Sequence, residues 1–181
     1  MKTKLYQLIM RMFMVVLGLT ACTSATATTP STATAPAADY KNATYQVEGQ
    51  PVNLLNGVSE VESAPGSATK IITRYFGNEA FGDLNGDGKQ DVAFLITQEG
   101  GGSGTFFYVV VALATDQDYQ GTNAVLLGDR IAPQTTSIDN GTIVVNYADR
   151  NPGESFTVQP SVGVSRYFKV VDGKLVQVEK Q

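Results

Sequence analysis

The chain contains no histidine, no tryptophan and only one cysteine, Cys22. Without histidine, the Ser-His-Asp and Cys-His systems of nucleophilic catalysis are excluded, because both need an imidazole as the general base. A single cysteine cannot form a disulfide within the chain. The fold must therefore be stabilised by a packed core, with or without a metal ion.

Positive charge and long apolar runs are also scarce. The 181 residues hold 13 Lys and Arg against 17 Asp and Glu, a net charge of -4. A nucleic-acid-binding surface needs a concentrated basic face, so we expect no nucleic-acid partner. No segment has the long apolar period of a helix, and the apolar run after Arg11 is too short to span a bilayer.

What the first 22 residues do contain is an ordered pattern. Lys2, Lys4 and Arg11 make a basic start, residues 12–21 carry no charge, and the small residue Ala21 precedes Cys22. This pattern resembles the signal peptide and lipobox of bacterial lipoproteins. The resemblance implies export, cleavage of residues 1–21 and lipid on the Cys22 sulfur, and several acyl chains hold a protein on a membrane far better than one.

The resemblance also implies a location. Thr23 is not aspartate, which in Gram-negative sorting favours the outer membrane; otherwise the protein would lie on the outer face of the cell membrane. The alternative is an ordinary secretory signal with a cysteine near its end. Removal of three basic residues with the signal leaves ten basic against seventeen acidic residues, a net charge near −7.

Residues 22–39 follow as a tether. Between Cys22 and Asp39 they contain only Thr, Ser, Ala and Pro, so they lack the large apolar side chains of a core. We expect a flexible spacer, and its Thr and Pro content also permits a glycosylated stalk.

From residue 40 to 181 the pattern changes to short segments rich in Val, Ile, Thr, Tyr and Phe, separated by turn pairs such as Asn-Gly and Asp-Gly. This predicts one all-β domain, an antiparallel β-sandwich or partly open barrel built from hairpins, with no long helix. Residues 92–97 and 106–113 are more continuously apolar than the other segments and are expected to be central strands buried on both faces, with Phe106, Phe107 and Tyr108 in the core. The other expected strands are 44–48, 52–55, 58–62, 68–76, 123–127, 142–147, 166–171 and 174–178.

One motif carries chemistry. The segment Asp83-Leu-Asn85-Gly-Asp87-Gly-Lys89-Gln-Asp91 places oxygen-bearing side chains at alternating positions. Calcium binds six to eight oxygens, and a curled loop can turn alternate carboxylates inward. We interpret Asp83, Asn85, Asp87 and Asp91 as side-chain ligands and the Lys89 carbonyl as a backbone ligand of a structural calcium ion. The alternative is a polar turn without metal.

The motif begins like an EF-hand loop, but Phe94 occupies the position of the bidentate glutamate, and strands are expected on both sides. Residues 82–95 instead resemble the calcium loops of FG-GAP and VCBS-type β-repeats. The resemblance covers little more than a dozen residues, so it implies a loop and a structural calcium ion, and no activity.

A second group of polar residues lies in expected loops: Asp129, Arg130, Asp149, Arg150 and Glu154. Loop residues often bind ligands, so these form a second candidate site. The first hypothesis is a non-enzymatic, calcium-stabilised module of the bacterial envelope that binds an envelope protein or glycan. The alternative is a hydrolase of envelope glycans that uses carboxylates among Asp129, Asp149 and Glu154. A purely structural accessory module is a third reading.

Overall fold

The computed structural model describes residues 39–180, so Cys22 and nearly all of the proposed tether lie outside the described part of the chain. The described residues form one short 3₁₀ helix and twelve strands. The all-β class is confirmed, and this part of the chain has no long helix. The elements are η1 (Tyr40–Asn42), β1 (Thr44–Val47), β2 (Gln50–Asn53), β3 (Val58–Glu62), β4 (Lys70–Gly82), β5 (Asp91–Gly100), β6 (Phe106–Ala114), β7 (Tyr119–Gly121), β8 (Val125–Asp129), β9 (Ala132–Asp139), β10 (Thr142–Asp149), β11 (Val162–Val171) and β12 (Lys174–Val178).

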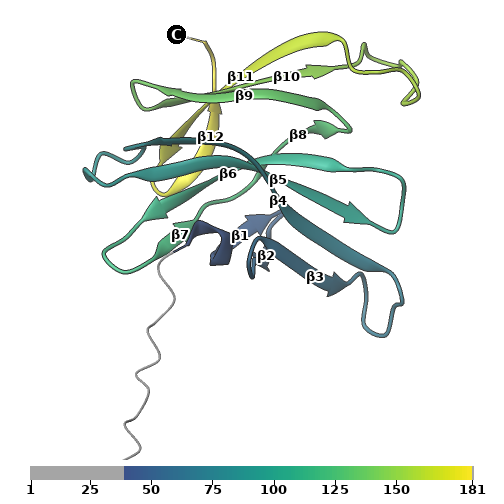
Figure 1. Ribbon diagram of the computed structural model, residues 1–181, viewed down its shortest axis with the longest axis horizontal. Helices are drawn as coiled ribbons and strands as arrows, with labels where there is room; N and C mark the ends of the chain where they lie inside the picture. The colour runs from purple at the N-terminus through teal and green to yellow at the C-terminus, as the bar shows by residue number, and fades with distance from the viewer. Residues whose placement is uncertain (1–38, 181) are drawn as a thin grey trace, which may run out of the picture. The chain divides into compact units, whose positions relative to one another are not determined.

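The strands form three layers (Figure 1). One layer is a four-stranded sheet in the order β12-β11-β10-β9. The middle layer is a six-stranded sheet in the order β3-β4-β5-β6-β7, with β8 paired to β6 beside β7. The third layer is the β1-β2 hairpin with η1. Every pair of named strands is antiparallel, so the fold is a sandwich with an added hairpin.

The two central strands, β5 and β6, carry the core on both faces. Side chains alternate along a strand, so one set faces each neighbouring layer. Leu95 and Val109 belong to the cluster shared with the four-stranded sheet, which includes Ile143 and Phe168. The intervening residues, such as Phe94, belong to the cluster under the β1-β2 hairpin. Burial on both faces, which the continuous apolar runs predict, is confirmed.

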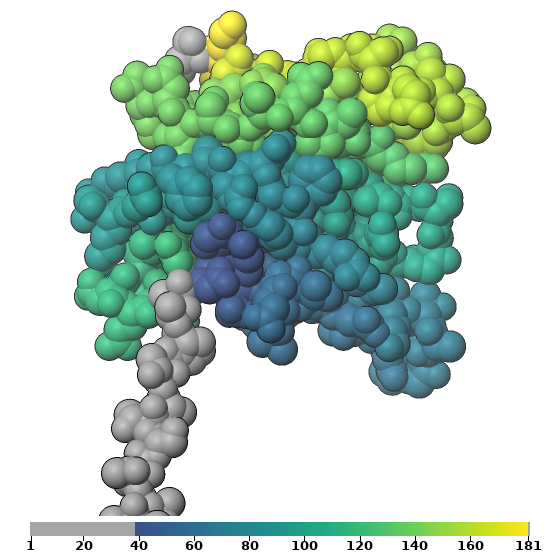
Figure 2. Space-filling model, viewed as in Figure 1, coloured from purple at the N-terminus to yellow at the C-terminus, as the bar shows by residue number. Residues whose placement is uncertain are grey.

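The hairpin layer is fixed by aromatic packing. The ring of Tyr45 on β1 meets Phe94 edge-on at 5.5 Å between centroids, and Tyr45 is fully buried. Tyr40 of η1 packs against Phe94 at 5.3 Å and against Tyr119 at 5.8 Å. In Figure 2 the purple and blue residues at the start of the described chain lie against the teal strands of the middle sheet. The first elements of the described chain, η1 and β1, therefore belong to a layer that packs on the central strands of the middle sheet.

Two strands were not expected from the sequence. Strand β7 has only three residues, and β9 contains Pro133 among mostly polar residues. Strand β9 lies at the edge of its sheet, where a residue without an N–H is tolerated, and Pro133 pairs with Tyr147 next to a register shift. The expectation that Phe106 is a core residue is wrong. Phe106 begins β6 and remains 40% exposed, while Phe107 and Tyr108 are buried.

Candidate functional site

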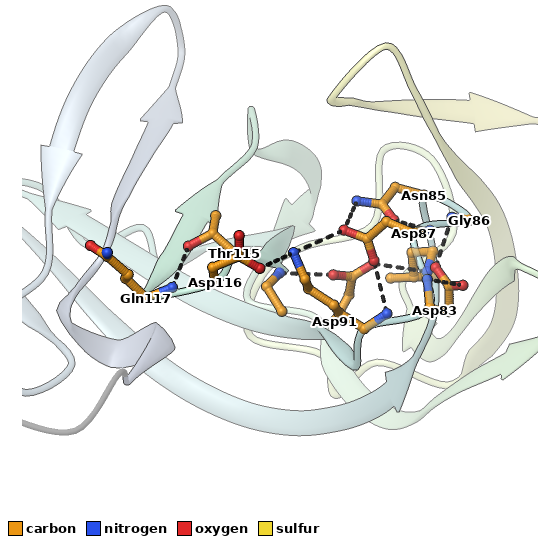
Figure 3. A network of polar contacts seen from close by, with 12 residues as sticks. Asp83, Asn85, Gly86, Asp87, Asp91, Thr115, Asp116 and Gln117 are labelled. Carbon is orange, nitrogen blue, oxygen red and sulfur yellow. Dashed lines mark hydrogen bonds and ion pairs between the residues drawn. The ribbon is translucent and has the colours of Figure 1, made fainter.

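The candidate metal loop connects the end of β4 to the start of β5, and it is curled by its own side chains (Figure 3). The carboxylate of Asp83 accepts the backbone N–H of Gly86 at 2.7 Å and that of Gly88 at 2.9 Å. Both glycines have positive φ angles, near +80°, which favour residues without a Cβ. The Gly88 and Gly86 N–H groups hold the pKa of the Asp83 carboxyl below its usual range, so this group stays negatively charged.

The next two alternating side chains continue the curl. Asn85 Oδ1 accepts the backbone N–H of Asp87 at 2.9 Å, and Asp87 Oδ1 accepts that of Lys89 at 2.8 Å. The second oxygen of Asp87 lies 3.2 Å from the Asn85 amide nitrogen and 4.0 Å from Lys89 Nζ. Asp83, Asn85 and Asp87 therefore gather oxygens on one curled segment.

Lys89 has a closer ionic partner outside the loop. Its ammonium lies 2.9 Å from Asp116 Oδ1 in the turn after β6, and each group favours the charged form of the other. The hydrogen bond to Asp116 raises the pKa of Lys89, and the same contact lowers the pKa of Asp116. Both side chains are well exposed, so water screens this pair.

Asp91 differs from the other three loop residues because it is fully buried. Its Oδ2 accepts the backbone N–H of Leu84 at 2.9 Å, and its Oδ1 accepts that of Ala114 at 2.8 Å. The carboxylate thus joins the start of the loop to the end of β6. Asp91 braces the loop through both of its oxygens.

The donor set fits calcium in kind, because the loop offers carboxylate, amide and carbonyl oxygens and no nitrogen or sulfur ligand. In arrangement the fit is partial. Within residues 39–180, no three acidic side chains converge as a group that could hold a metal ion. The Asp87 carboxylate is also partly satisfied by the Asn85 amide and the Lys89 ammonium.

The second group of predicted residues is brought together where the β8-β9 turn meets the β10-β11 loop. Arg150 Nη1 donates to the carbonyl oxygen of Arg130 at 2.9 Å and so joins the two segments. The ring of Phe156 lies 3.9 Å from the Arg130 guanidinium carbon and 5.3 Å from that of Arg150. Phe156 is 51% exposed, and a polar loop with one large aromatic residue was a signal that sequence reasoning missed.

The three carboxylates of this region are occupied by local partners. Asp129 is held by the Thr105 N–H at 2.9 Å and by the Arg130 guanidinium at 2.9 Å. Asp149 and Glu154 line a shallow hollow of ≈ 400 Å³, and each accepts a backbone N–H from the β10-β11 loop. Asp129 does not line that hollow. Of the three, only Asp149 and Glu154 therefore share a hollow.

A further hollow is a groove of ≈ 730 Å³ that the sequence did not predict. It lies between β2 and β3, on the part of the middle sheet next to the β1-β2 hairpin. Apolar side chains line it, among them Val52, Leu55, Val61 and Ile71, and Leu55 and Val61 are 65% and 53% exposed. A volume of this size is typical of sites that bind ligands.

The groove is acidic at its margins. Glu48, Glu60 and Glu62 are among its lining residues, and within the described chain no Lys or Arg lines it. Glu48 has a positive φ angle in the β1-β2 turn and accepts the Tyr108 hydroxyl at 2.9 Å. The Tyr108 pKa is raised, by burial first and by Glu48 second. Acidic residues therefore border an apolar floor, and one of them, Glu60, is paired with Lys70 on the neighbouring strand.

Comparison of the chain with family models, with curated proteins and with solved structures found no match in any of the three. No helix among residues 39–180 is both long enough and apolar enough to cross a membrane. A functional proposal must therefore rest on the geometry of the sites themselves.

Proposed function

We propose that this chain is a non-enzymatic binding module of the bacterial envelope, and that the groove between β2 and β3 is its binding site. The observation that carries the proposal is the groove itself, a ≈ 730 Å³ hollow with exposed apolar side chains. Exposed apolar surface of this kind marks interaction sites in soluble domains. The apolar floor favours a polypeptide over a glycan as the partner.

The anchoring part of the proposal rests on the sequence pattern that ends at Cys22. Lipid on Cys22 would hold the module on a membrane, the outer membrane in a Gram-negative cell or the outer face of the cell membrane otherwise. Residues 23–38 would hold the domain away from the lipid surface. These residues lie outside the described part of the chain, and the test is mass spectrometry of the mature N-terminus.

Calcium, in this proposal, has a structural role in the loop before β5. Asp83, Asn85, Asp87 and the Lys89 carbonyl would supply most of the oxygens, and a cation would offset the charge gathered there. Asp91 supports the same loop by accepting the backbone N–H groups of Leu84 and Ala114. Calcium would therefore stabilise the entry into β5 and take no part in a reaction.

The binding proposal is tested by photocrosslinking in living cells of the source bacterium. A photoreactive phenylalanine analogue replaces Val61 in the groove or, as the matched control, Val176 on β12, which is 42% exposed in the other sheet. We expect a discrete adduct with an envelope protein from position 61 and none from position 176. Equal adduct patterns from both positions, or no adduct from position 61, would contradict the proposal.

A further inference from the structure

The groove is bordered by two strand edges that, apart from one bridge between Leu55 and Val58, have no further strand partner in the described chain. Strand β2 pairs only with β1, and β3 pairs only with β4 at the end of the middle sheet. At one end Leu55 and Val58 close the groove by exchanging backbone hydrogen bonds of 2.9 and 3.2 Å. Beyond this bridge the two strands separate around the hollow.

The free edge of β3 offers main-chain donors and acceptors to the groove. Residues in an antiparallel pair alternate between bonding the partner and pointing away from it. The Tyr75 N–H donates to the Gly57 carbonyl, and the Ser63 N–H donates to the Thr69 carbonyl. Both bonds keep the register of the β3-β4 pairing. The N–H and C=O groups of Ser59 and Val61 therefore face β4. Those of Glu60 and Glu62 face the groove.

The edge of β2 is less able to accept a new strand. The Leu54 N–H donates to the Ala43 carbonyl. In the β1-β2 register, the residues whose backbone N–H and C=O groups point away from β1 are therefore Pro51 and Asn53. Pro51 has no N–H to donate, and proline is typical of strand edges that do not pair. An incoming extended chain would therefore pair with β3.

Side-chain alternation sets the chemistry of such a partner. On β3, Val61 lies on the groove side with its cross-strand neighbour Ile71, while Glu60 and Glu62 lie on the opposite face of the sheet. Residues of an added strand would alternate in the same way. Those opposite Val61 would meet an apolar floor, and those opposite Glu60 and Glu62 would meet carboxylates. Both carboxylates have an exposed partner already, since Glu60 pairs with Lys70 on β4 and Glu62 accepts the Gly66 N–H at 2.8 Å, so a basic partner would share them. Opposite charges in such cross-strand pairs are favourable.

A second copy of this chain fits this edge poorly. In an antiparallel pairing of two β3 strands centred on Glu60, Glu60 would face Glu60 and Val58 would face Glu62. Like charges directly opposite each other are destabilising, and charged residues at edges are a known protection against self-association. The same charges attract a basic strand.

We propose that the groove binds an extended polypeptide segment with alternating apolar and basic residues, added as a strand to the free edge of β3. The inference rests on the proposed binding function and deepens it. Main-chain bonds to Glu60 and Glu62 would give affinity, and the apolar floor and the two carboxylates would give specificity. Binding would weaken as salt rises, because the Glu60 carboxylate, which a basic residue would share with Lys70, is 44% exposed.

The test uses the full chain in detergent and a fluorescent peptide of alternating lysine and valine, seven residues long. We expect saturable binding, with slower hydrogen exchange at the amides of Glu60 and Glu62 and little change at Ser59 and Val61. Glu60→Pro removes one groove-facing N–H and leaves the backbone bonds to β4 in place, but it also removes the side-chain pair between Glu60 and Lys70. Glu60→Ala, which loses the same pair and keeps the N–H, is therefore its reference, and Glu60→Pro should bind at least ten-fold more weakly than Glu60→Ala. Val176→Lys, on β12, is the matched control and should leave binding unchanged.

Charge specificity is tested with an alternating glutamate and valine peptide, which we expect to bind at least ten-fold more weakly. The double variant Glu60→Lys, Glu62→Lys should reverse this preference. Three results would overturn the proposal: no saturable binding of the basic peptide at millimolar concentration, equal binding of both peptides, or a bound peptide that leaves the Glu60 and Glu62 amides unprotected. If position 61 gives adducts but the Glu60 and Glu62 amides stay unprotected, the proposed binding function is supported and only the proposed strand addition is refuted.

Discussion

The carboxylate of Asp91 and the backbone N–H of Ala114 are joined at 2.8 Å, although the two residues belong to the start of β5 and the end of β6. The other oxygen of Asp91 accepts the Leu84 N–H at 2.9 Å, so one buried side chain fixes both the loop before β5 and the neighbouring strand end. A buried charge is tolerated where hydrogen bonds surround it.

Replacement of Asp91 by asparagine should lower the free energy of unfolding by about 2–3 kcal/mol, because one buried N–H loses its acceptor and meets an amide group instead. The measurement is urea unfolding of a soluble form that begins at Thr23, in the presence of chelator so that metal plays no part. Asp116→Asn, in an exposed turn, is the control and should leave the midpoint unchanged. Equal midpoints for the unmutated chain and Asp91→Asn would contradict the bracing role.

Calcium should raise the melting temperature of the same soluble form. If the folded loop binds an ion that the unfolded chain does not, stability rises as RT ln(1 + [L]/Kd), about 2.7 kcal/mol at one hundred times Kd. Asp87→Ala should remove most of this dependence, because it deletes a proposed ligand at an exposed position. Asp149→Ala, in the β10-β11 region, should retain it. Melting curves of the unmutated chain that coincide in calcium and in chelator would mean that the loop is only a turn.

The hairpin layer makes a close contact at Gly121 on β7. A Cβ at this position would lie 2.3 Å from the backbone oxygen of Thr44 and 2.7 Å from the Tyr45 ring. Gly121→Ala should therefore push β1 away from the middle sheet and cost about 2–3 kcal/mol of stability. Gly163→Ala, where nothing lies within 4 Å, is the matched control and should cost far less. Similar costs for both variants, measured by urea unfolding, would show that the hairpin packs less closely.

Stability should also fall at alkaline pH, and Tyr45 should account for part of the loss. Burial raises the pKa of Tyr45 above its ordinary value of 10.0, so the folded state keeps a proton that the unfolded chain releases. This contribution is complete below pH 10 and is lost as the pH rises further.

Tyr45→Phe removes this titration and the hydrogen bond of 2.6 Å to the Tyr40 carbonyl, at a cost of about 1 kcal/mol near pH 7. Urea unfolding between pH 7 and pH 11 should show a shallower decline for the variant than for the unmutated chain. Parallel declines would assign the alkaline loss to other groups, such as Tyr108.

Much of this fold could be predicted from local patterns. The continuous apolar runs of β5 and β6 predict strands buried on both faces, because each face needs its own apolar set. Asn140-Gly141 and Asp172-Gly173 adopt the positive φ angles that their hairpins require. Strand β9 could not be predicted in this way. None of its residues is fully buried, so it has no apolar pattern of its own, and its pairing with β10 is what makes it a strand.

The candidate sites were predictable only where one short segment contains them. The loop from Asp83 to Asp91 is local, so its oxygens were found, but spacing alone could not distinguish the buried brace Asp91 from the exposed Asp87. The groove depends on how the β1-β2 hairpin packs on the middle sheet, and no spacing within the sequence encodes that. The proximity of Phe156 to Arg130 is likewise a tertiary contact between two loops.

The most direct test of the central claim combines the groove with its strand edge in the living cell. The photoreactive analogue is placed at Leu55, which is exposed in the groove, in the unmutated chain and in the Glu60→Pro variant. We expect a discrete envelope-protein adduct in the unmutated chain and its loss in the variant, with equal amounts of both chains on the membrane. An adduct of equal yield in both chains would contradict binding along the β3 edge, and no adduct in either would contradict the groove as the binding site.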